Sequence, residues 1–398
     1  MSGNLYDICI IGGLGHIGLP LGIAFAKTGK RVVLNDINAT IADQVMQGCM
    51  PFVEEGAEDG LKEVLGKTLF ISLDKKVITE SHFVVVVIGT PIDEHLNPSF
   101  TLFRNFFDDI VGHIVDGQHI VLRSTVYPGA TEKISRYFAE RNKKVKLSFC
   151  PERIAEGKAL VELYTLPQII SAFDSESLAE AKELFSAFTS EILTLEPVEA
   201  ELAKLFTNSW RYLQFSISNY FYQISTQYGI DFYKIFNAIR YKYPRAENFP
   251  APGFAAGPCL LKDTMQLVSF SNNNFFLGHA AMLVNEGLPN FIVSRLKERH
   301  NLVDKSVGIL GMAFKANSDD KRESLSYKLR KLLTAEARDV YCTDVYIKED
   351  GFVEAEKLIK SSDIIIVATP HREYKELRIP IGTVLVDVWN YYGNGGIF

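Results

Sequence analysis

Short, unbroken hydrophobic runs alternate with amphipathic stretches through the first part of the chain. The runs with the length of buried strands are Tyr6–Gly12, Arg31–Leu34, Phe83–Ile88, Gln118–Leu122 and Lys144–Cys150. Hydrophobic runs of about four to eight residues without alternation are typical of strands buried on both faces of a parallel sheet. The pattern predicts an α/β domain with crossover helices, the first of them over Leu14–Thr28.

The pattern changes near Glu196, where a helical periodicity begins that continues to about Tyr228. Its hydrophobic positions follow helical spacing and include Leu202, Leu205, Phe206, Leu213 and Ile217. This spacing predicts one long helix, with few glycines or prolines to interrupt it. More helical sequence follows, broken by the proline-rich segment Tyr243–Pro258.

The last part of the chain is similar to the first. Ser306–Gly311 resembles the opening strand and its glycine turn, and Ser362–Pro370 resembles Ser81–Pro91. This weak internal duplication predicts two Rossmann-like, doubly wound sheets joined by a long central helix and a helical region. The expected domains are residues 1–196, a central helical part at 197–300, and residues 301–398.

Composition excludes several classes of partner. The chain has 398 residues and a net charge of −6, which gives no basic footprint for nucleic acid and no block of lysine or arginine for a membrane surface. Its most hydrophobic runs, Val84–Ile88 and Ile364–Val367, fall far short of the roughly 20 residues that span a bilayer. We expect no signal peptide, because the strand-like sequence begins at Tyr6.

The cysteines are odd in number and dispersed, and they show neither metal-ligand spacing nor a disulfide framework. We therefore expect no metal site and a reducing, cytoplasmic compartment. Cys9, Cys150 and Cys342 lie in or beside strand-like runs, where buried structural thiols are expected. Only Cys259 lies in a setting that suggests chemistry.

A G-x-G-x-x-G motif, Gly13, Gly15 and Gly18, follows the first strand and opens the first helix. The first glycine is expected to permit the tight turn, the second to let the backbone approach a pyrophosphate, and the third to pack helix on strand. Asp36 follows at the end of the second strand, where a carboxylate accepts from a ribose hydroxyl. Since no arginine adjoins Asp36, NAD is predicted rather than NADP.

Four further residues belong to the predicted cofactor site. His16 and Ile17 lie within the glycine motif, and His16 is interpreted as a spacer because it has no partner motif. Thr90 and Thr125 each follow a strand, at the carboxyl edge where open α/β sheets bind ligands. Helix capping is the structural alternative for both hydroxyls.

Cys259 follows a loop of small residues and a proline, and we expect it to open a helix. The helix N-terminus and the nearby Lys262 would both favour the thiolate and lower the pKa below the free value of about 8.5. Asp263 falls four residues later on the same helical face, where it would handle protons. The alternative is a helix-start cysteine beside a solvated Lys–Asp pair.

Over nearly its full length the chain resembles the UDP-glucose/GDP-mannose dehydrogenase family. The matching motifs, in order, are Gly13–Gly18, Gly89–Pro91, Ser124–Val126, Pro151–Arg153 with Glu156, Glu201 with Lys204 and Asn208, Cys259–Asp263, and Phe314–Ser324. Each is modest alone, but their correct order makes the set specific. The resemblance implies an N-terminal NAD-binding domain, a C-terminal UDP-sugar-binding domain and a homodimer formed through the central helices.

The family chemistry is a four-electron oxidation of the C6 alcohol of a UDP-sugar with two NAD. A first oxidation gives an aldehyde, which Cys259 would capture as a thiohemiacetal. A second gives a thioester, which water releases as the uronate. A thiolate is the natural nucleophile for this sequence of steps.

The resemblance also implies roles for individual residues, several of which would contact the sugar as well. Lys204 and Asn208 would stabilise oxyanions, and Glu152, Asp263 and Thr125 would hold and deprotonate water. The implied NAD contacts are Glu156, Lys262 and Arg322. The implied substrate contacts are Glu152, Lys204, Asn208, Phe249, Pro250, Ala251, Pro252, Ala256 and Lys315. Solvated helix faces, caps and salt bridges are the structural alternatives.

The sequence departs from the family pattern at the cysteine loop, where Phe254 and Ala256 replace glycines, and at Tyr220. Other motifs point in part to N-acetylhexosamine members and in part to UDP-glucose members, so the sugar stays open between the two. One alternative function is a two-electron hydroxyacid or polyol dehydrogenase in which Cys259 is incidental. Another is a non-catalytic NAD- or nucleotide-sugar-binding regulator, against which the complete set of predicted catalytic residues argues.

Overall fold

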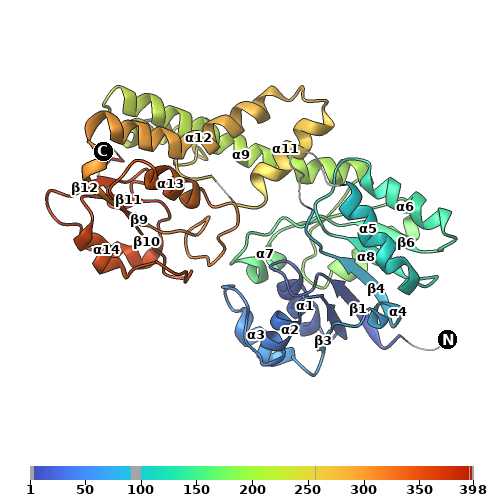
Figure 1. Cartoon of the computed structure of the whole chain (residues 1–398). Helices are drawn as coiled ribbons and strands as arrows, with labels where there is room; N and C mark the ends of the chain where they lie inside the picture. Colours follow the sequence, from blue (N-terminus) through green and yellow to red (C-terminus); the bar gives the residue numbers. More distant parts are fainter. Residues whose placement is uncertain (1–3, 91–99, 256, 394, 397–398) are drawn as a thin grey trace. The chain divides into compact units, whose positions relative to one another are not determined.

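The computed structural model describes residues 4–90, 100–255, 257–393 and 395–396. It contains two compact units, Met1–Thr207 and Asn208–Phe398, each built on a sheet that is parallel or mostly parallel (Figure 1). Helix α9, Pro197–Gln227, begins in the first unit and ends in the second. The predicted α/β class, the two doubly wound sheets and the long helix are confirmed, while the division into three domains stays a prediction.

The first unit holds an eight-stranded sheet in the order β3-β2-β1-β4-β5-β6-β7-β8. Its strands are β1 (Tyr6–Ile11), β2 (Val32–Asn35), β3 (Leu69–Ser72), β4 (Ser81–Val86), β5 (His119–Leu122), β6 (Lys146–Phe149), β7 (Gln168–Ala172) and β8 (Ile192–Thr194). All five predicted strands are present, and β3, β7 and β8 were not predicted. The sheet is parallel, as predicted, except that β6 and β7 run antiparallel.

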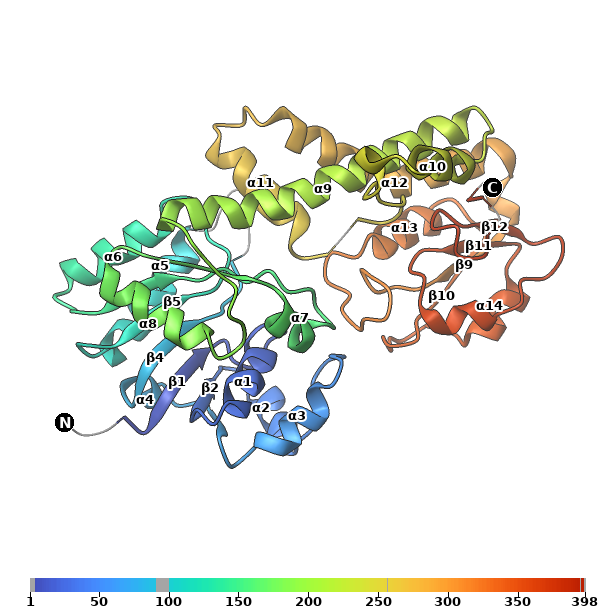
Figure 2. The same cartoon turned by 180° about the vertical axis from the view of Figure 1, so that it is seen from behind.

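Helices cover both faces of this sheet. They are α1 (Gly18–Lys27), α2 (Ala39–Met46), α3 (Ala57–Val64), α4 (Lys76–Thr79), α5 (Phe100–Ile110), α6 (Ala130–Glu140), α7 (Ala159–Thr165) and α8 (Ser175–Phe185). In both views α2 and α3 lie beside β1–β3, and α5 and α6 lie beside β5 and β6 (Figures 1 and 2).

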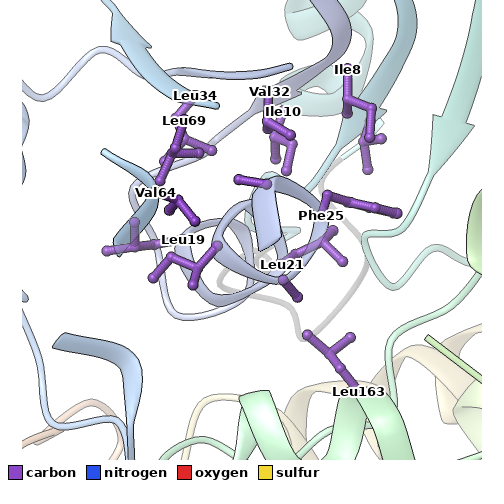
Figure 3. Close-up of a cluster of buried hydrophobic side chains, with 14 of the residues drawn as sticks. Ile8, Ile10, Leu19, Leu21, Phe25, Val32, Leu34, Val64, Leu69 and Leu163 are labelled. Atoms are coloured by element: carbon purple, nitrogen blue, oxygen red, sulfur yellow. The ribbon is translucent and has the colours of Figure 1, made fainter. Parts of the chain in front are cut away.

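Alternate side chains of β1 enter different cores, which explains its unbroken hydrophobic sequence. Ile8 and Ile10 pack with α1, α3, α7 and α8, and Figure 3 shows them with Leu19, Leu21 and Phe25 of α1. On the opposite face, Cys9 and Ile11 pack with α5 and α6. A fully buried side chain of this size stabilises the fold by about 1.5–3 kcal/mol, so this packing fixes where the turn after β1 lies.

The second unit holds a four-stranded parallel sheet in the order β10-β9-β11-β12. Its strands are β9 (Ser306–Leu310), β10 (Asp339–Thr343), β11 (Ile364–Val367) and β12 (Val384–Val386). Besides the end of α9, its helices are α10 (Phe232–Arg240), α11 (Leu260–Phe270), α12 (Phe276–Arg299), α13 (Leu325–Thr334) and α14 (Ala355–Ser361). One face packs on α10, α12 and α13, and the other on α14. Short 3-10 turns lie at Val111–His113, Pro244–Ala246, Leu302–Asp304 and Arg372–Glu376.

Each sheet has a point at which the strand order reverses, between β1 and β4 in the first and between β9 and β11 in the second. The loops at the carboxyl ends of these strands border the crevice where open α/β sheets bind ligands. Among the helices in the described ranges, none combines the length and hydrophobicity needed to cross a membrane.

Candidate active site

The glycine motif forms a close crossing between β1 and α1. The left-handed residue of the turn is Gly12, with φ +78°, and not Gly13, so the predicted assignment of the tight turn is shifted by one residue. A Cβ on Gly13 would lie 2.8 Å from the Leu34 Cβ, and one on Gly18 would lie 2.5 Å from the Gly12 oxygen. Gly15 borders open space, since its nearest neighbour would be 3.7 Å away.

The start of α1 fits a dinucleotide phosphate. Ile17 is the N-cap residue and offers no side-chain cap, and the first turn holds no acidic residue. The Leu19 N–H already donates to the Gly15 carbonyl oxygen at 3.1 Å and Pro20 has no N–H, so the start of the helix would attract an anion mainly through its partial positive charge. His16 stacks on Phe52 at 4.1 Å between ring centroids.

Asp36 lies half-buried directly after β2, as predicted. Its carboxylate accepts from the backbone N–H of Leu14 at 3.1 Å and from those of Ile37 and Asn38 at 2.8 and 3.1 Å. These bonds join the acid to the glycine motif and orient it at the carboxyl edge of the sheet. The residues therefore fit the ribose end of a dinucleotide.

Thr90 and Thr125 come together at the ends of β4 and β5. The Thr90 hydroxyl donates to the Thr125 carbonyl oxygen at 2.7 Å, and the Ser124 hydroxyl donates to the Ile88 carbonyl oxygen at 2.7 Å. Both predicted hydroxyls thus lie beside the crevice of the first sheet. Pro91 lies outside the described residues.

Glu152 is buried after β6 and has a partner that sequence reasoning missed. Its Oε1 accepts from the backbone N–H groups of Arg153 and Ile154 at 2.5 and 2.7 Å, and its carboxylate forms an ion pair with Arg123. The Arg123 guanidinium is wholly buried and also donates to the Cys150 carbonyl oxygen at 3.1 Å. The available signal was an arginine directly after a hydrophobic strand run, since a buried charge needs a partner.

Two more predicted residues of the first unit lie on α9, and a third follows Glu152. Glu201 is buried and receives the backbone N–H of Gly129 at 2.5 Å and both the N–H and the hydroxyl of Thr131, at 2.7 and 2.6 Å. Burial raises the pKa of the Glu201 carboxyl despite these donors. Lys204 is 9% exposed and precedes Asn208 by one helical turn, while Glu156 is half-buried in the loop after β6.

Cys259 is the exposed residue that immediately precedes α11, as predicted. Three other cysteines are buried, and burial raises the pKa of the Cys9 and Cys150 thiols and that of Cys342 to about 11. Since the thiolate is the nucleophile, these three are unsuited to covalent chemistry. Cys49 is exposed and follows α2, outside every predicted motif of the sequence.

Asn208 and Asp263 meet in the second unit. The Asn208 side-chain amide donates to Asp263 Oδ2 at 2.6 Å, and both residues are buried. Lys262 Nζ lies 3.4 Å from Asp263 Oδ1. Asp263 is one turn after Cys259, and its backbone N–H donates to the Cys259 carbonyl oxygen at 2.9 Å. The unit thus places an amide, a carboxylate and a thiol at the start of one helix.

The predicted substrate segment Phe249–Pro252 is fixed to α9. The Ser218 hydroxyl donates to the Pro250 carbonyl oxygen at 2.7 Å, and Asn219 exchanges hydrogen bonds with the backbone of Gly253 at 2.8 and 3.0 Å. The Phe249 ring packs on Phe221 and Phe236, with centroids 6.0 and 5.8 Å apart.

The two departures of the cysteine loop have different outcomes. Phe254, which replaces a family glycine, is 7% exposed and packs in the core of the second unit. The replacement of glycine by Phe254 therefore anchors the cysteine loop, because the phenylalanine side chain packs into the core. Ala256 lies outside the described residues.

The loop between β9 and α13 carries Lys315 and Arg322. Lys315 is half-buried, and the Arg322 guanidinium is paired with the Asp320 carboxylate at 2.5 Å. The loop also touches the cysteine loop: the Gly257 N–H approaches the Glu323 carbonyl oxygen at 3.5 Å. A Cβ on Gly257 would lie 2.6 Å from the Phe314 ring.

The predicted residues thus fall into two groups. The first unit carries the glycine motif, Asp36, Thr90, Thr125, Glu152, Glu156 and Lys204, and the second carries Asn208, Phe249–Pro252, Cys259, Lys262, Asp263, Lys315 and Arg322. Their roles as ligands and catalysts stay predictions.

Comparison with known proteins extends over the whole chain. Three models of the UDP-glucose/GDP-mannose dehydrogenase family match it: the NAD binding domain at residues 6–189, the central domain at 198–286 and the UDP binding domain at 308–394. A UDP-N-acetyl-D-mannosamine dehydrogenase of Methanococcus maripaludis is 30% identical over 390 residues, covering 94% of this chain and 88% of the relative. The enzyme of the same name from Pyrococcus horikoshii is 27% identical, covering 92% and 90%.

Solved structures show the same likeness. A UDP-glucose dehydrogenase from Pyrobaculum islandicum superposes with a TM-score of 0.89 at 25% identity, covering 100% of this chain and 99% of that one. A UDP-D-ManNAc dehydrogenase from Pyrococcus horikoshii gives 0.88 at 26% identity, covering 96% and 94%.

Two doubly wound sheets in matched NAD- and UDP-binding domains, and a glycine turn that fits NAD, define an NAD-dependent oxidoreductase acting on a nucleotide-linked substrate. The chain belongs to the UDP-glucose/GDP-mannose dehydrogenase family. It is an NAD-dependent UDP-sugar 6-dehydrogenase, so the predicted family, the cofactor NAD and the class of substrate are confirmed.

Proposed function

We propose that this enzyme oxidises the C6 alcohol of UDP-N-acetyl-D-mannosamine fully to the carboxylate, through a covalent bond to Cys259. The observation that carries the proposal is the exposed Cys259 thiol at the start of α11, one turn before the Asn208–Asp263 pair. The names of the relatives from Methanococcus maripaludis and Pyrococcus horikoshii support this sugar. UDP-glucose is the second candidate, supported by the name of the Pyrobaculum islandicum structure.

The residues of the first sheet suit the cofactor. Gly13–Gly18 and the start of α1 would hold the pyrophosphate, and Asp36 would accept from the adenosine ribose. Thr90 and Thr125, joined at the sheet edge, would border the nicotinamide end, and Glu156, Lys262 and Arg322 are the further proposed contacts. NAD supplies a hydride acceptor at the sugar carbon.

The proposed chemistry has three steps. The C6 alcohol loses a hydride to the first NAD and a proton to a base, which gives the aldehyde. The Cys259 thiolate adds to that carbonyl to form a thiohemiacetal alkoxide, which loses a second hydride to the second NAD and becomes a thioester. Water attacks the thioester, so the C–S bond breaks and the carboxylate and free thiol are formed.

The other proposed catalytic side chains would lower the barriers of these steps. Lys204 and Asn208 are proposed to stabilise the oxyanion as each tetrahedral carbon forms. Asp263 is proposed as the base for water, with Thr125 and Glu152 orienting it. The 2.6 Å bond from Asn208 fixes Asp263 Oδ2, which keeps the carboxylate in one orientation. Phe249–Pro252, Ala256 and Lys315 are the proposed contacts to the UDP-sugar.

The test measures NADH formed per sugar consumed, with UDP-linked glucose, N-acetylglucosamine, N-acetylgalactosamine and N-acetylmannosamine. We expect two NADH per N-acetylmannosamine, and Cys259→Ser to stop before the uronate while keeping NAD affinity. Cys49→Ser is the matched control, because Cys49 is the other exposed cysteine. One NADH per sugar, or full uronate production by Cys259→Ser, would favour a two-electron dehydrogenase with an incidental Cys259.

We also propose that the enzyme is a homodimer formed along α9. Trp210, Ile217, Phe221 and Ile224 are exposed at 59%, 45%, 42% and 37%, and they recur at helical spacing. Exposed hydrophobic surface of this extent marks an interaction site, and a second copy is the partner that the family resemblance implies. A cytoplasmic location is proposed because the predicted nucleophile needs a reducing compartment.

A further inference from the structure

His371 is a buried imidazole at the carboxyl edge of the second sheet to which the proposed chemistry assigns no role. It follows Thr369 and Pro370 after β11, the motif that resembles Thr90 and Pro91 after β4. Its side chain is wholly buried. Because the strand order reverses between β9 and β11, the residue lies where this sheet is expected to meet its ligand.

Both ring nitrogens of His371 have a partner. Nδ1 receives the backbone N–H of Asn317 at 3.0 Å, and Nε2 lies 3.0 Å from Asp344 Oδ2. A nitrogen that accepts an N–H carries no proton, so the proton is on Nε2 and is donated to Asp344. The two contacts therefore fix one neutral tautomer.

Asp344 is a rigid anchor for this imidazole. Its oxygens accept the backbone N–H groups of Met312, Ala313, Tyr346 and Ile347 at 2.6 to 3.0 Å. Burial alone would raise the pKa of the Asp344 carboxyl, but the hydrogen bonds from His371 and from the backbone N–H groups of Ile347 and Met312 lower it. The carboxylate is thus a fixed anion at neutral pH.

The other partner, Asn317, belongs to the loop between β9 and α13. Asn317 adopts a left-handed backbone, φ +56°, and its side-chain oxygen accepts the Arg372 N–H at 3.1 Å. It follows Lys315 by two residues, and the same loop reaches Gly257 beside the cysteine. The bond to His371 therefore holds the segment that carries the proposed UDP-sugar lysine.

We propose that His371 is a positioning residue for the nucleotide-sugar site, which ties the Asp344 anion to Asn317 and so holds Lys315 for the diphosphate of UDP. The inference rests on the proposed role of Lys315. His371 acts through the loop and does not touch the substrate.

Two variants separate the two ring contacts. His371→Asn keeps an acceptor near the position of Nδ1, and His371→Gln keeps a donor near the position of Nε2. With UDP as the probe in calorimetric titration, we expect His371→Gln to weaken Kd about tenfold, the effect of one lost hydrogen bond. We expect His371→Asn to remain within about threefold of the wild type, and KM for the UDP-sugar to follow the same order while kcat at saturation changes less than about twofold.

Several results would overturn the proposal. If the variants lower the melting temperature but leave the Kd for UDP unchanged, the role of His371 is purely structural. If both variants weaken UDP binding equally, the hydrogen bond to Asn317 is not the cause of the weaker binding. Should His371→Gln not fold, the ¹⁵N spectrum of the histidine-labelled wild type decides, since a proton on Nδ1 of His371 contradicts the tautomer. The titration contains neither NAD nor sugar, so a wild type that binds UDP without forming NADH would refute the proposed oxidation and not the role of His371.

Discussion

The buried pair Arg123–Glu152 allows the sharpest prediction about the first unit. We expect Arg123→Met, which fills a similar volume without charge, to leave the Glu152 carboxylate buried with only two backbone N–H donors. Removal of one partner of a buried ion pair costs about 3–5 kcal/mol. Because the two donors remain, we expect the lower value, about 3 kcal/mol, which in a unit of this size lowers the melting temperature by about 6–12 °C.

The double variant tests the cause. In Arg123→Met with Glu152→Gln no charge is left unpaired, so we expect a loss of only about 1 kcal/mol, well below the sum of the losses in the two single variants. The matched control is Arg136→Met, because Arg136 pairs with Glu132 at 3.1 Å on the exposed face of α6. Its loss should not exceed about 0.5 kcal/mol.

Thermal unfolding and NADH formation are measured on the same preparations. The variant should also lower kcat, since Arg123 orients the carboxylate proposed to hold water. A loss below about 1 kcal/mol for Arg123→Met, or a double variant as unstable as the sum of the single ones, would refute this account of the pair.

Three further predictions concern other parts of the chain. Gly257→Ala places a Cβ 2.6 Å from an aromatic ring at φ +102°, and we expect unfolding free energy to fall by about 2–4 kcal/mol. Burial lowers the pKa of His119 below its ordinary 6.5, so as the pH falls the unfolded chain binds this proton before the folded chain does. The melting temperature of the wild type should therefore fall as the pH drops below about 6.5, and that of His119→Gln should fall less. Ile217→Glu should convert the proposed dimer to monomer in light scattering.

Each of these has a control. Gly382→Ala adds a Cβ at φ +95° with no atom within 4 Å, so an equal loss in both glycine variants would contradict the contact. Identical pH slopes for wild type and His119→Gln would exclude the histidine, whose surroundings also hold Glu180, Lys146 and His82. Gln227→Glu, an exposed polar position at the end of α9, should leave the dimer intact, and a monomeric wild type would refute the interface.

How far sequence predicts this fold depends on burial. Among the predicted strands, β1 and β5 bury hydrophobic side chains on both faces, which is why they contain nearly continuous hydrophobic runs. The missed strands lack that signal: β3 has one buried residue, β8 has none, and β7 carries Gln168 and Ser171 among its buried positions. Edge strands face solvent, so their sequence need not be continuous in hydrophobicity.

The candidate site shows the same limit at the level of single contacts. Motif spacing located Cys259, Asp263 and Asp36 because local helix and strand geometry determines where those residues lie. The pairing of Arg123 with Glu152 depends on the adjacency of β5 and β6, which only the sheet order establishes. Phe254 belongs to a core assembled from distant elements, so its burial had no local signal either.

The internal duplication explains why two similar sheets differ in what they can hold. In each sheet, an aspartate directly follows the strand that pairs with the opening strand. Asp36 follows β2, which pairs with β1, and Asp344 follows β10, which pairs with β9. Asp36 is half-buried with three backbone donors, and it keeps acceptor capacity for a ribose hydroxyl. Asp344 is buried and accepts hydrogen bonds from four backbone N–H groups and from His371. A carboxylate has about four lone-pair sites, so these donors already occupy all of them. The second sheet therefore cannot recognise a ribose through its strand-end acid, and recognition of its ligand must come from the loop that Asp344 and His371 hold in place.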